Sequence, residues 1–225
     1  MISSQSVEIQ NLIAFVDIFA AISFAATGAL VASRKGLDIL AFMWLAVLTG
    51  VGGGTVRDLV LDAPVFWVGN PNYLAICLIT AVAVYLAAPY IESRYKLLIW
   101  FDALGLAFVT VAGTAKSLDY GTGALVAVVL GVVTASVGGI IRDLVGEEPS
   151  IILKREIYVT AAASGGCVYV LADGLAIPGL NPALAGFIVT LIVRGLAIHF
   201  DWMMPGYRRP AKQANNPESL NDQQQ

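Results

Sequence analysis

The stretch Gly53-Gly54-Thr55-Val56-Arg57-Asp58-Leu59-Val60 recurs as Gly138-Gly139-Ile140-Ile141-Arg142-Asp143-Leu144-Val145, at an offset of 85 residues. The same offset, without a gap, aligns further identical residues, among them Asp17 with Asp102, Gly28 with Gly113, Gly36 with Gly121, Thr49 with Thr134, Pro64 with Pro149 and Tyr73 with Tyr158. A match of this extent indicates an internal duplication.

The composition places the chain in a lipid bilayer. Of its 225 residues, 58% are hydrophobic and only 13% are charged, whereas soluble domains average about a quarter charged. The mean hydropathy is +0.78. The net charge of -3 is small, and there is no basic run interleaved with aromatic residues, so the sequence gives no support to nucleic-acid binding.

Seven apolar stretches are long enough to cross about 30 Å of hydrocarbon as helices. They cover residues 11–33, 38–57, 72–91, 97–117, 122–141, 155–173 and 179–199. The polar leader before the first stretch lacks the basic start and cleavage site of a signal peptide, so we expect this span to be retained. The Pro- and Gln-rich residues 201–225 predict a disordered cytoplasmic tail.

The duplication divides these spans into two repeats of three. Residues 11–91 form the first repeat, 97–173 form the second, and 179–200 form a seventh helix without a counterpart. Since three is odd, the second copy must enter the membrane from the opposite face. The predicted fold is therefore an all-α integral membrane protein of two inverted three-helix repeats plus one helix, an arrangement that recurs in permeation proteins.

Basic residues between the spans predict the orientation. One side of the predicted topology carries Arg34, Lys35, Arg94, Lys96, Arg142, Lys154, Arg155, Arg208, Arg209 and Lys212. The other side carries Arg57 and Lys116. By the positive-inside rule, the amino terminus lies outside and the carboxyl terminus in the cytoplasm, in the plasma (inner) membrane of a bacterium.

Glycines stand at the carboxyl ends of the second and fifth spans. They are Gly52, Gly53 and Gly54 in the first copy and Gly138 and Gly139 in the second. Each lowers helix propensity by about 1 kcal/mol relative to Ala, so a bend or a close helix approach is expected. Tight packing explains one such cluster, whereas two clusters at symmetric positions favour bends that line a pathway.

Each glycine cluster is followed by a charged pair that lies at the depth of an acidic residue. Span 1 carries Asp17 at the depth of Arg57 and Asp58 on span 2. By inverted symmetry an equivalent set lies near the cytoplasmic face: Asp102, Arg142 and Asp143. A carboxylate at this depth is costly unless it is paired or faces water. Each set is either a charged vestibule at one mouth or a structural ion pair between neighbouring spans, and the two are compatible.

Other polar residues give weaker signals. Thr49 and Thr134, with Ser136 nearby, are candidate pore hydroxyls, although a threonine can equally bond to its own helix. Lys116 corresponds to Val31 in the other repeat, and it either anchors span 4 at the interface or controls a cation path. Arg194 on the seventh span is expected to extend to the headgroups.

The sequence contains no catalytic constellation. It has one His, no metal-spaced His or Cys cluster, no nucleophile elbow and no phosphate loop. We therefore expect neither an enzyme nor a bound cofactor or metal beyond permeating ions.

The twin motif and the three-plus-three-plus-one order of spans resemble the prokaryotic trimeric intracellular cation (TRIC) channels over roughly residues 11–200. The resemblance implies a homotrimer in which each subunit has its own hourglass pore for K⁺ and Na⁺. It implies that spans 1, 2, 4 and 5 line this pore and that glycine kinks in spans 2 and 5 shape the gate. The chain has Val137 where the first copy has Gly52, and it lacks the Lys-Glu-Val motif of the animal members.

Three functions remain open from the sequence. The first is a monovalent cation channel with Asp17 and Asp102 at its mouths. The second is a small-solute carrier of the glycine type, because the same domain has carried a glycine-transporter label. It would hold its substrate at half-helix ends. The third is a scaffold whose glycine motifs only pack helices.

Overall fold

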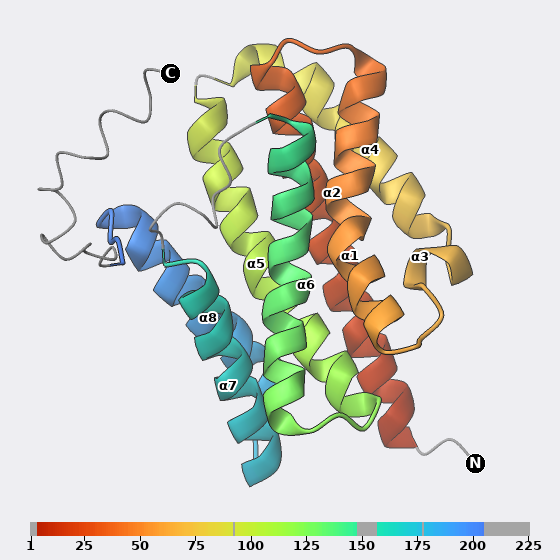
Figure 1. The fold of residues 1–225 in the computed structure, drawn as a ribbon, viewed down its shortest axis with the longest axis vertical. Helices are drawn as coiled ribbons and strands as arrows, with labels where there is room; N and C mark the ends of the chain where they lie inside the picture. The colour runs from red at the N-terminus through yellow and green to blue at the C-terminus, as the bar shows by residue number, and fades with distance from the viewer. Residues whose placement is uncertain (1–3, 92, 148–156, 177, 205–225) are drawn as a thin grey trace, which may run out of the picture.

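The computed structural model describes residues 4–91, 93–147, 157–176 and 178–204, with side chains from residue 14 onward (Figure 1). Its helices are α1 (Ser4–Arg34), α2 (Ile39–Val60), α3 (Phe66–Gly69), α4 (Asn72–Ala87), α5 (Arg94–Asp119), α6 (Ala124–Val145), α7 (Val159–Leu175) and α8 (Pro182–His199). A 3-10 turn at Ala88–Tyr90 follows α4. The predicted tail lies outside the described residues from 205 onward.

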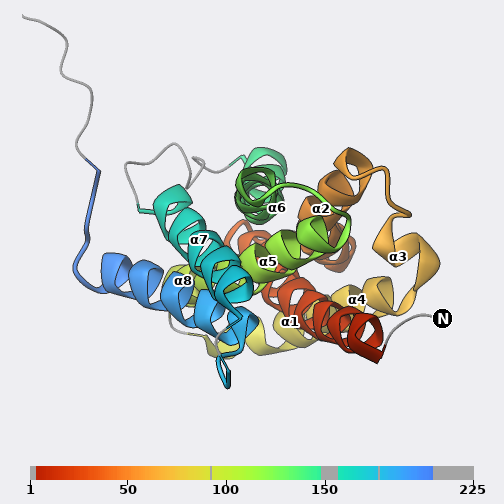
Figure 2. The same ribbon diagram turned by 90° about the horizontal axis from the view of Figure 1, so that it is seen from below.

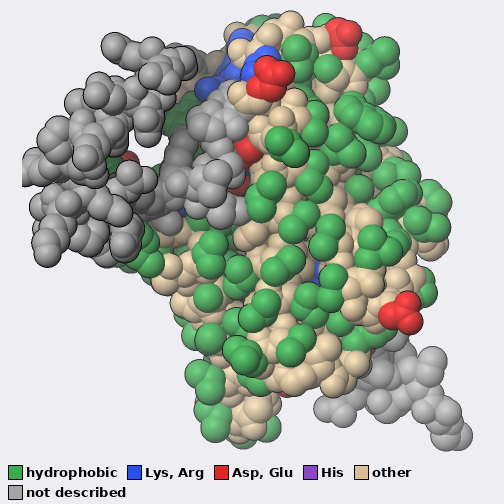
Figure 3. All heavy atoms as spheres, in the orientation of Figure 1, with side chains coloured by type: hydrophobic (Ala, Val, Ile, Leu, Met, Phe, Trp, Pro, Cys, Tyr) green, Lys and Arg blue, Asp and Glu red, His purple; other side chains and the backbone are tan. Residues whose placement is uncertain are grey.

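The predicted all-helical membrane fold is confirmed. Within the described chain, six helices are long and apolar enough to cross a membrane, namely α1, α2, α4, α5, α6 and α8. The remaining long helix, α7, is apolar but has only 17 residues. Hydrophobic side chains cover most of the face in Figure 3, while many of its charged groups lie toward one end. This surface is suited to contact with lipid tails.

The two repeats have opposite directions. In Figure 1, α1 runs against α5, α2 against α6, and α4 against α7. The turns are repeated as well, because Gly36 and Gly121 both have positive φ angles, of 65° and 77°. Asp62 and Glu147 likewise share φ angles of 52° and 47°. Each pair is related by the 85-residue offset, so the duplication extends to the backbone conformation of the loops.

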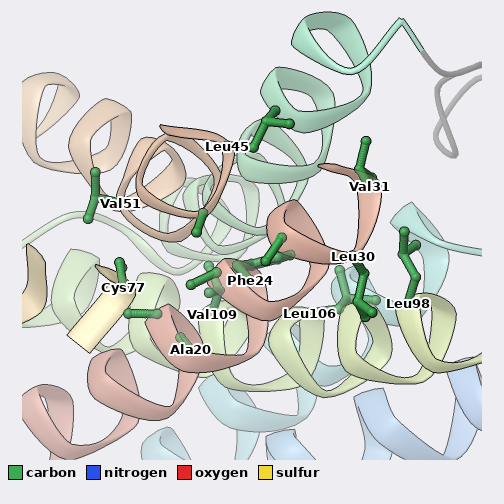
Figure 4. Packing of buried hydrophobic residues seen from close by; sticks show 14 of the residues in the cluster. Ala20, Phe24, Leu30, Val31, Leu45, Val51, Cys77, Leu98, Leu106 and Val109 are labelled. Atoms are coloured by element: carbon green, nitrogen blue, oxygen red, sulfur yellow. The ribbon is translucent and has the colours of Figure 1, made fainter. Parts of the chain in front are cut away.

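The centre of the molecule is built from the first two helices of each repeat. Here α1 packs against α2 and α5, and α6 packs against α2 and α5. The end-on view shows α3 and α4 on one side of these four helices and α7 and α8 on the other (Figure 2). Many of the buried side chains are alanines, which let the helices approach closely, and Phe24 and Leu106 fill space between α1 and α5 (Figure 4).

The short helix α3 was not predicted from the sequence, in which residues 64–72 read as a simple break. Asp58, near the end of α2, accepts two hydrogen bonds from the segment that leads into α3. The main-chain carbonyl of Asp58 accepts a hydrogen bond from the amide of Ala63 at 2.8 Å. Its carboxylate accepts one from the amide of Phe66, the first residue of α3, at 2.9 Å.

Candidate functional site

A first charge cluster joins α1, α2 and α5. It consists of Asp17, Arg57, Asp58 and Lys116. The guanidinium of Arg57 donates to both carboxylate oxygens of Asp17, with Nη1–Oδ1 and Nη2–Oδ2 distances of 3.1 and 3.3 Å. Its Nε donates to Oδ1 of Asp58 at 2.8 Å. The ammonium of Lys116 lies 2.8 Å from the same Asp58 oxygen.

The structure thus gives Lys116 a third role, because neither sequence interpretation included a buried carboxylate partner. This lysine comes from the second repeat but completes a cluster of the first repeat. The Lys116–Asp58 ion pair ties α5 to the end of α2. The position of the charge was visible in the sequence, whereas its partner depends on how the two repeats interlock.

Aromatic residues of α3 close the first cluster on one side. The ring of Phe66 lies 5.7 Å from the guanidinium carbon of Arg57. The same ring lies against Gly54, where an added Cβ would be 2.6 Å from the Cε1 atom of Phe66. Next to it, the indole Nε1 of Trp67 donates to the hydroxyl of Thr55 at 2.8 Å. Neither aromatic residue was singled out from the sequence.

A second charge cluster repeats this arrangement between α5 and α6. It consists of Asp102, Arg142 and Asp143. Nη1 of Arg142 donates to Oδ1 of Asp102 at 2.8 Å, and its Nε donates to Oδ1 of Asp143 at 2.9 Å. The second oxygen of Asp102 is buried and has no hydrogen-bond partner among the described residues. Arg142 therefore donates to one carboxylate oxygen of Asp102, whereas Arg57 donates to both carboxylate oxygens of Asp17.

The surroundings of the second cluster also differ from those of the first. Tyr158, whose repeat partner is Tyr73, donates from its hydroxyl to the carbonyl of Ala135 at 3.3 Å. The guanidinium carbon of Arg194 on α8 lies 5.2 Å from the centre of the Tyr158 ring. Arg194 is only 1% exposed, so the expectation that it extends to the headgroups is wrong. The 85-residue register relates Tyr158 to Tyr73 and could have identified it from the sequence. Arg194 had no such signal, because α8 has no counterpart in the other repeat.

Burial distinguishes the members of the two clusters. Arg57, Asp58, Asp102 and Arg142 are fully buried, and Asp143 is 4% exposed. In the first cluster, the side chains of Asp17 and Lys116 are 10% and 14% exposed. The structural ion pairs expected as one alternative are therefore present. The partly exposed members of the first cluster are therefore Asp17 and Lys116.

The two glycine motifs meet where α2 crosses α6. A Cβ added to Gly53 would collide with the carbonyl oxygen of Thr134. A Cβ added to Gly138 would lie 3.0 Å from the carbonyl oxygen of Thr49. These contacts are related by the repeat, since Gly53 corresponds to Gly138 and Thr49 to Thr134. The crossing is thus a reciprocal backbone contact between the two halves of the chain.

The helices continue through both glycine clusters. The helix α2 extends to Val60 and α6 extends to Val145, so neither cluster breaks its helix. The alternative of a close helix approach applies at Gly53 and Gly138, whereas a bend at these glycines stays a prediction. The physical reason is that removing the Cβ lets the main chains touch, and the packing offsets the low helix propensity of glycine. Gly52 also serves packing, because the Cδ1 atom of Ile141 lies 2.7 Å from its Cβ position.

Gly139 differs from the other motif glycines because its surroundings are open. The nearest atom to its Cβ position is the hydroxyl oxygen of Tyr158 at 3.5 Å, followed by Arg142 and Asp102 atoms at 3.8 and 3.9 Å. A methyl group therefore fits at this position. Equivalent glycines of the two motifs thus have different roles, and Gly54 and Gly139 are the clearest case.

The candidate pore hydroxyls bond to their own helices. The hydroxyl of Thr49 donates to the carbonyl of Leu45 at 2.6 Å, and that of Thr134 donates to Leu130 at 2.5 Å. Both threonines are buried, in line with the alternative of bonding within the helix. Ser136 is 8% exposed, and within the part of the chain that the structure describes its buried hydroxyl has no hydrogen-bond partner.

Paired inverted repeats, a lipid-facing surface and buried Arg–Asp clusters define an integral membrane protein with the TRIC channel fold. The chain belongs to the glycine transporter family, whose model matches residues 14–89 and 99–173, once in each repeat. It is 36% identical over 202 residues to the UPF0126 inner membrane protein YadS of Escherichia coli K12, covering 87% of this chain and 96% of YadS. A UPF0126 membrane protein of Vibrio cholerae is also 36% identical, over 203 residues, covering 88% of this chain and 83% of that protein.

Solved structures share this fold. The TRIC trimeric intracellular cation channel orthologue from Rhodobacter sphaeroides is 44% identical, with a TM-score of 0.81, and the match covers 84% of this chain and 98% of that chain. A prokaryotic TRIC channel crystallised in 0.5 M KCl is 25% identical, with a TM-score of 0.80 over 85% of this chain and 98% of the channel.

Proposed function

We propose that the chain is a monovalent cation channel, permeable to K⁺ and Na⁺, with one pathway in each subunit of a homotrimer. The observation that carries this proposal is the reciprocal contact of Gly53 and Gly138 between two charge clusters. It places a narrow crossing of α2 and α6 between two groups of carboxylates. Acidic residues near each end of a pathway concentrate cations, and a narrow crossing provides a point of closure.

In this proposal, the helices α1, α2, α5 and α6 line the pathway. The first charge cluster stands at one mouth and the second at the other. The sequence identity of 44% to the Rhodobacter sphaeroides channel supports both cation conduction and a trimer. In this proposal the backbone contact between α2 and α6 corresponds to a closed state. Opening then requires the two helices to separate, or to kink at the glycines, and a kink in this region stays a prediction.

The orientation follows from the basic residues. Arg34, Lys35, Arg94 and Lys96 belong to the predicted cytoplasmic side, so the amino terminus is outside and the first charge cluster faces out. The similarity to an inner membrane protein of Escherichia coli supports a location in the bacterial inner membrane. Fusion of a reporter that is active only in the cytoplasm, at residue 204 and at the amino terminus, tests this orientation.

Recordings of purified protein in planar bilayers test conduction. We expect unitary currents whose reversal potential in a KCl gradient lies near that of K⁺ and far from that of Cl⁻. Replacing K⁺ with Na⁺ keeps the currents, whereas a large organic cation removes them. Mass measurement of the protein in detergent tests the trimer. Saturable solute flux without current would overturn the channel proposal.

The family description favours a carrier for glycine as the second candidate. Counterflow of labelled glycine in proteoliposomes tests it, and exchange no faster than in protein-free vesicles removes it. The continuous helices α2 and α6 count against the half-helix ends that a carrier of this kind uses for its substrate. The channel is therefore the function that the geometry supports best.

A further inference from the structure

The two mouths of the proposed pathway differ at the repeat position of Lys116. Lys116, on α5, places its ammonium 2.8 Å from Oδ1 of Asp58 at the end of α2. The residue equivalent to Lys116 is Val31 on α1. Val31 lies beside the end of α6 in the corresponding way, since its Cγ1 atom is 2.6 Å from the Cβ position of Gly146, three residues after Asp143. The second repeat therefore contributes the ammonium of Lys116 to the first charge cluster. At the equivalent place the first repeat contributes only the isopropyl group of Val31.

Exposure makes Lys116 the outermost basic group of its cluster. Arg57 and Asp58 are fully buried, whereas the Lys116 side chain is 14% exposed. A lysine ammonium is a compact point charge on a flexible stem, unlike the rigid guanidinium fork that Arg57 uses to hold Asp17 by both oxygens. Lys116 can therefore leave and return to Asp58, while Arg57 is fixed from both sides.

The ammonium lies against a carboxylate oxygen, and carboxylate oxygens are the kind of ligand that hard cations prefer. We propose that Lys116 is a tethered competitor of the permeating cation, whose ammonium occupies the cation position beside Asp58 and so makes conduction through the two mouths unequal. This inference rests on the proposed channel function. Its consequence is rectification, because cations that enter at the mouth of Asp17 and Lys116 meet an additional positive charge.

The opposite mouth has its own basic group. Arg194 of α8 lies over the Tyr158 ring and is buried, and Asp143 has further interactions of its own. The inference therefore does not depend on the net charge of the second cluster. It depends on Lys116 being partly exposed, flexible and in contact with Asp58.

The test is recording from inside-out patches of giant bacterial spheroplasts, in which all copies have one orientation. Lys116→Gln removes the charge, and Lys116→Arg keeps it. At about 10 mM salt, where the Debye length is about 30 Å, we expect Lys116→Gln to raise the current of cations entering at this mouth. The expected increase is on the order of threefold to tenfold. Lys116→Arg keeps the wild-type rectification, and the difference between variants shrinks at about 1 M salt.

The inverted repeat supplies a second variant that does not depend on the first. Val31→Lys adds an ammonium beside the end of α6, so it should reduce the current of cations that enter at the opposite mouth. In the double variant Lys116→Gln/Val31→Lys, the direction of rectification should reverse. A merely structural role of Lys116 would alter stability without reversing this direction.

The outcomes separate the inference from the function on which it rests. If the wild-type protein passes no cation current, the proposed function fails. If it conducts but Lys116→Gln and Val31→Lys both keep the wild-type rectification, the inference is overturned while the channel proposal stands. Equal currents in Lys116→Gln and Lys116→Arg would also overturn it, because then the charge is irrelevant.

Discussion

Gly53 on α2 lies against the main-chain carbonyl oxygen of Thr134 on α6, so closely that even one methyl group would collide with it. Its repeat partner Gly138 meets the carbonyl of Thr49 in the same way but with more room, at 3.0 Å. The halves of the chain thus touch backbone to backbone at the centre of the molecule.

Gly53→Ala should destabilise the protein, because the methyl group can be accommodated only if α2 and α6 separate. Overpacking of this kind costs about 1–3 kcal/mol. Gly138→Ala should cost less. Gly139→Ala is the matched control, because its Cβ has ordinary contacts and alanine gains about 1 kcal/mol of helix propensity. Equilibrium unfolding in mixed micelles measures all three, and equal stabilities would contradict the backbone contact.

Arg57→Gln should be strongly destabilising. The substitution leaves the carboxylates of Asp17 and Asp58 without their shared guanidinium, and breaking a buried ion pair costs about 3–5 kcal/mol. Arg57→Lys should recover only part of this loss, because an ammonium cannot hold both oxygens of Asp17 as a fork does. Adding Asp17→Asn to Arg57→Gln should restore stability relative to Arg57→Gln alone, as measured by thermal unfolding. Additive losses in the double variant would exclude coupling between the two residues.

Thr114 and Gly131 lie where α5, α6 and α7 pack together. We expect a substitution at Thr114 to compensate for the loss of stability caused by a larger residue at position 131. A Cβ at Gly131 would collide with the Thr114 hydroxyl, and the Cβ position of Gly166 is 3.3 Å from it. In the other repeat, three alanines occupy the equivalent positions: Ala29, Ala46 and Ala81. We expect Gly131→Ala to cost about 1–3 kcal/mol. Thr114→Ala should reverse only part of that loss, because the Cβ position of Gly131 is also 2.9 Å from the carbonyl oxygen of Thr110. A double-mutant cycle measures the coupling, and a coupling energy near zero would refute the compensation.

Thr49→Val should leave ion conduction nearly unchanged. The Thr49 hydroxyl is buried and bonds to the carbonyl of Leu45, so in the closed state it does not face a water-filled path. We expect a unitary conductance within about twofold of wild type and a loss of about 1 kcal/mol in stability. Thr134→Val provides the symmetric control. A large loss of conductance in both variants would mean that these hydroxyls turn toward the ions when the channel opens.

Several features were predictable because they depend on local periodicity or on the duplication. The apolar runs predicted the helices, and the 85-residue register predicted that Arg57 and Arg142 have equivalent surroundings. The ion pair of Asp17 with Arg57 was one of the two alternatives that their common depth left open. These inferences need only the hydrophobic effect and the cost of an unpaired charge in lipid.

Other features depend on how the helices are rotated and how the repeats interlock. Lys116 lies 58 positions from Asp58 in the chain, and nothing local links the two residues. The helix α3 begins where the carboxylate of Asp58, at the end of α2, accepts a hydrogen bond from the amide of Phe66. The burial of Arg194 against Tyr158 depends on where the unrepeated helix α8 docks.

The sequence by itself determined that this protein is a bundle of membrane helices made from two inverted copies, with charged motifs near opposite faces. A duplication is a property of the chain, and the choice of helix in lipid follows from the need to satisfy every backbone group within the segment. The tertiary structure alone decided that the glycines let α2 and α6 touch without breaking either helix. It also decided that Lys116 completes the first charge cluster, because both outcomes depend on contacts between helices that only packing brings together.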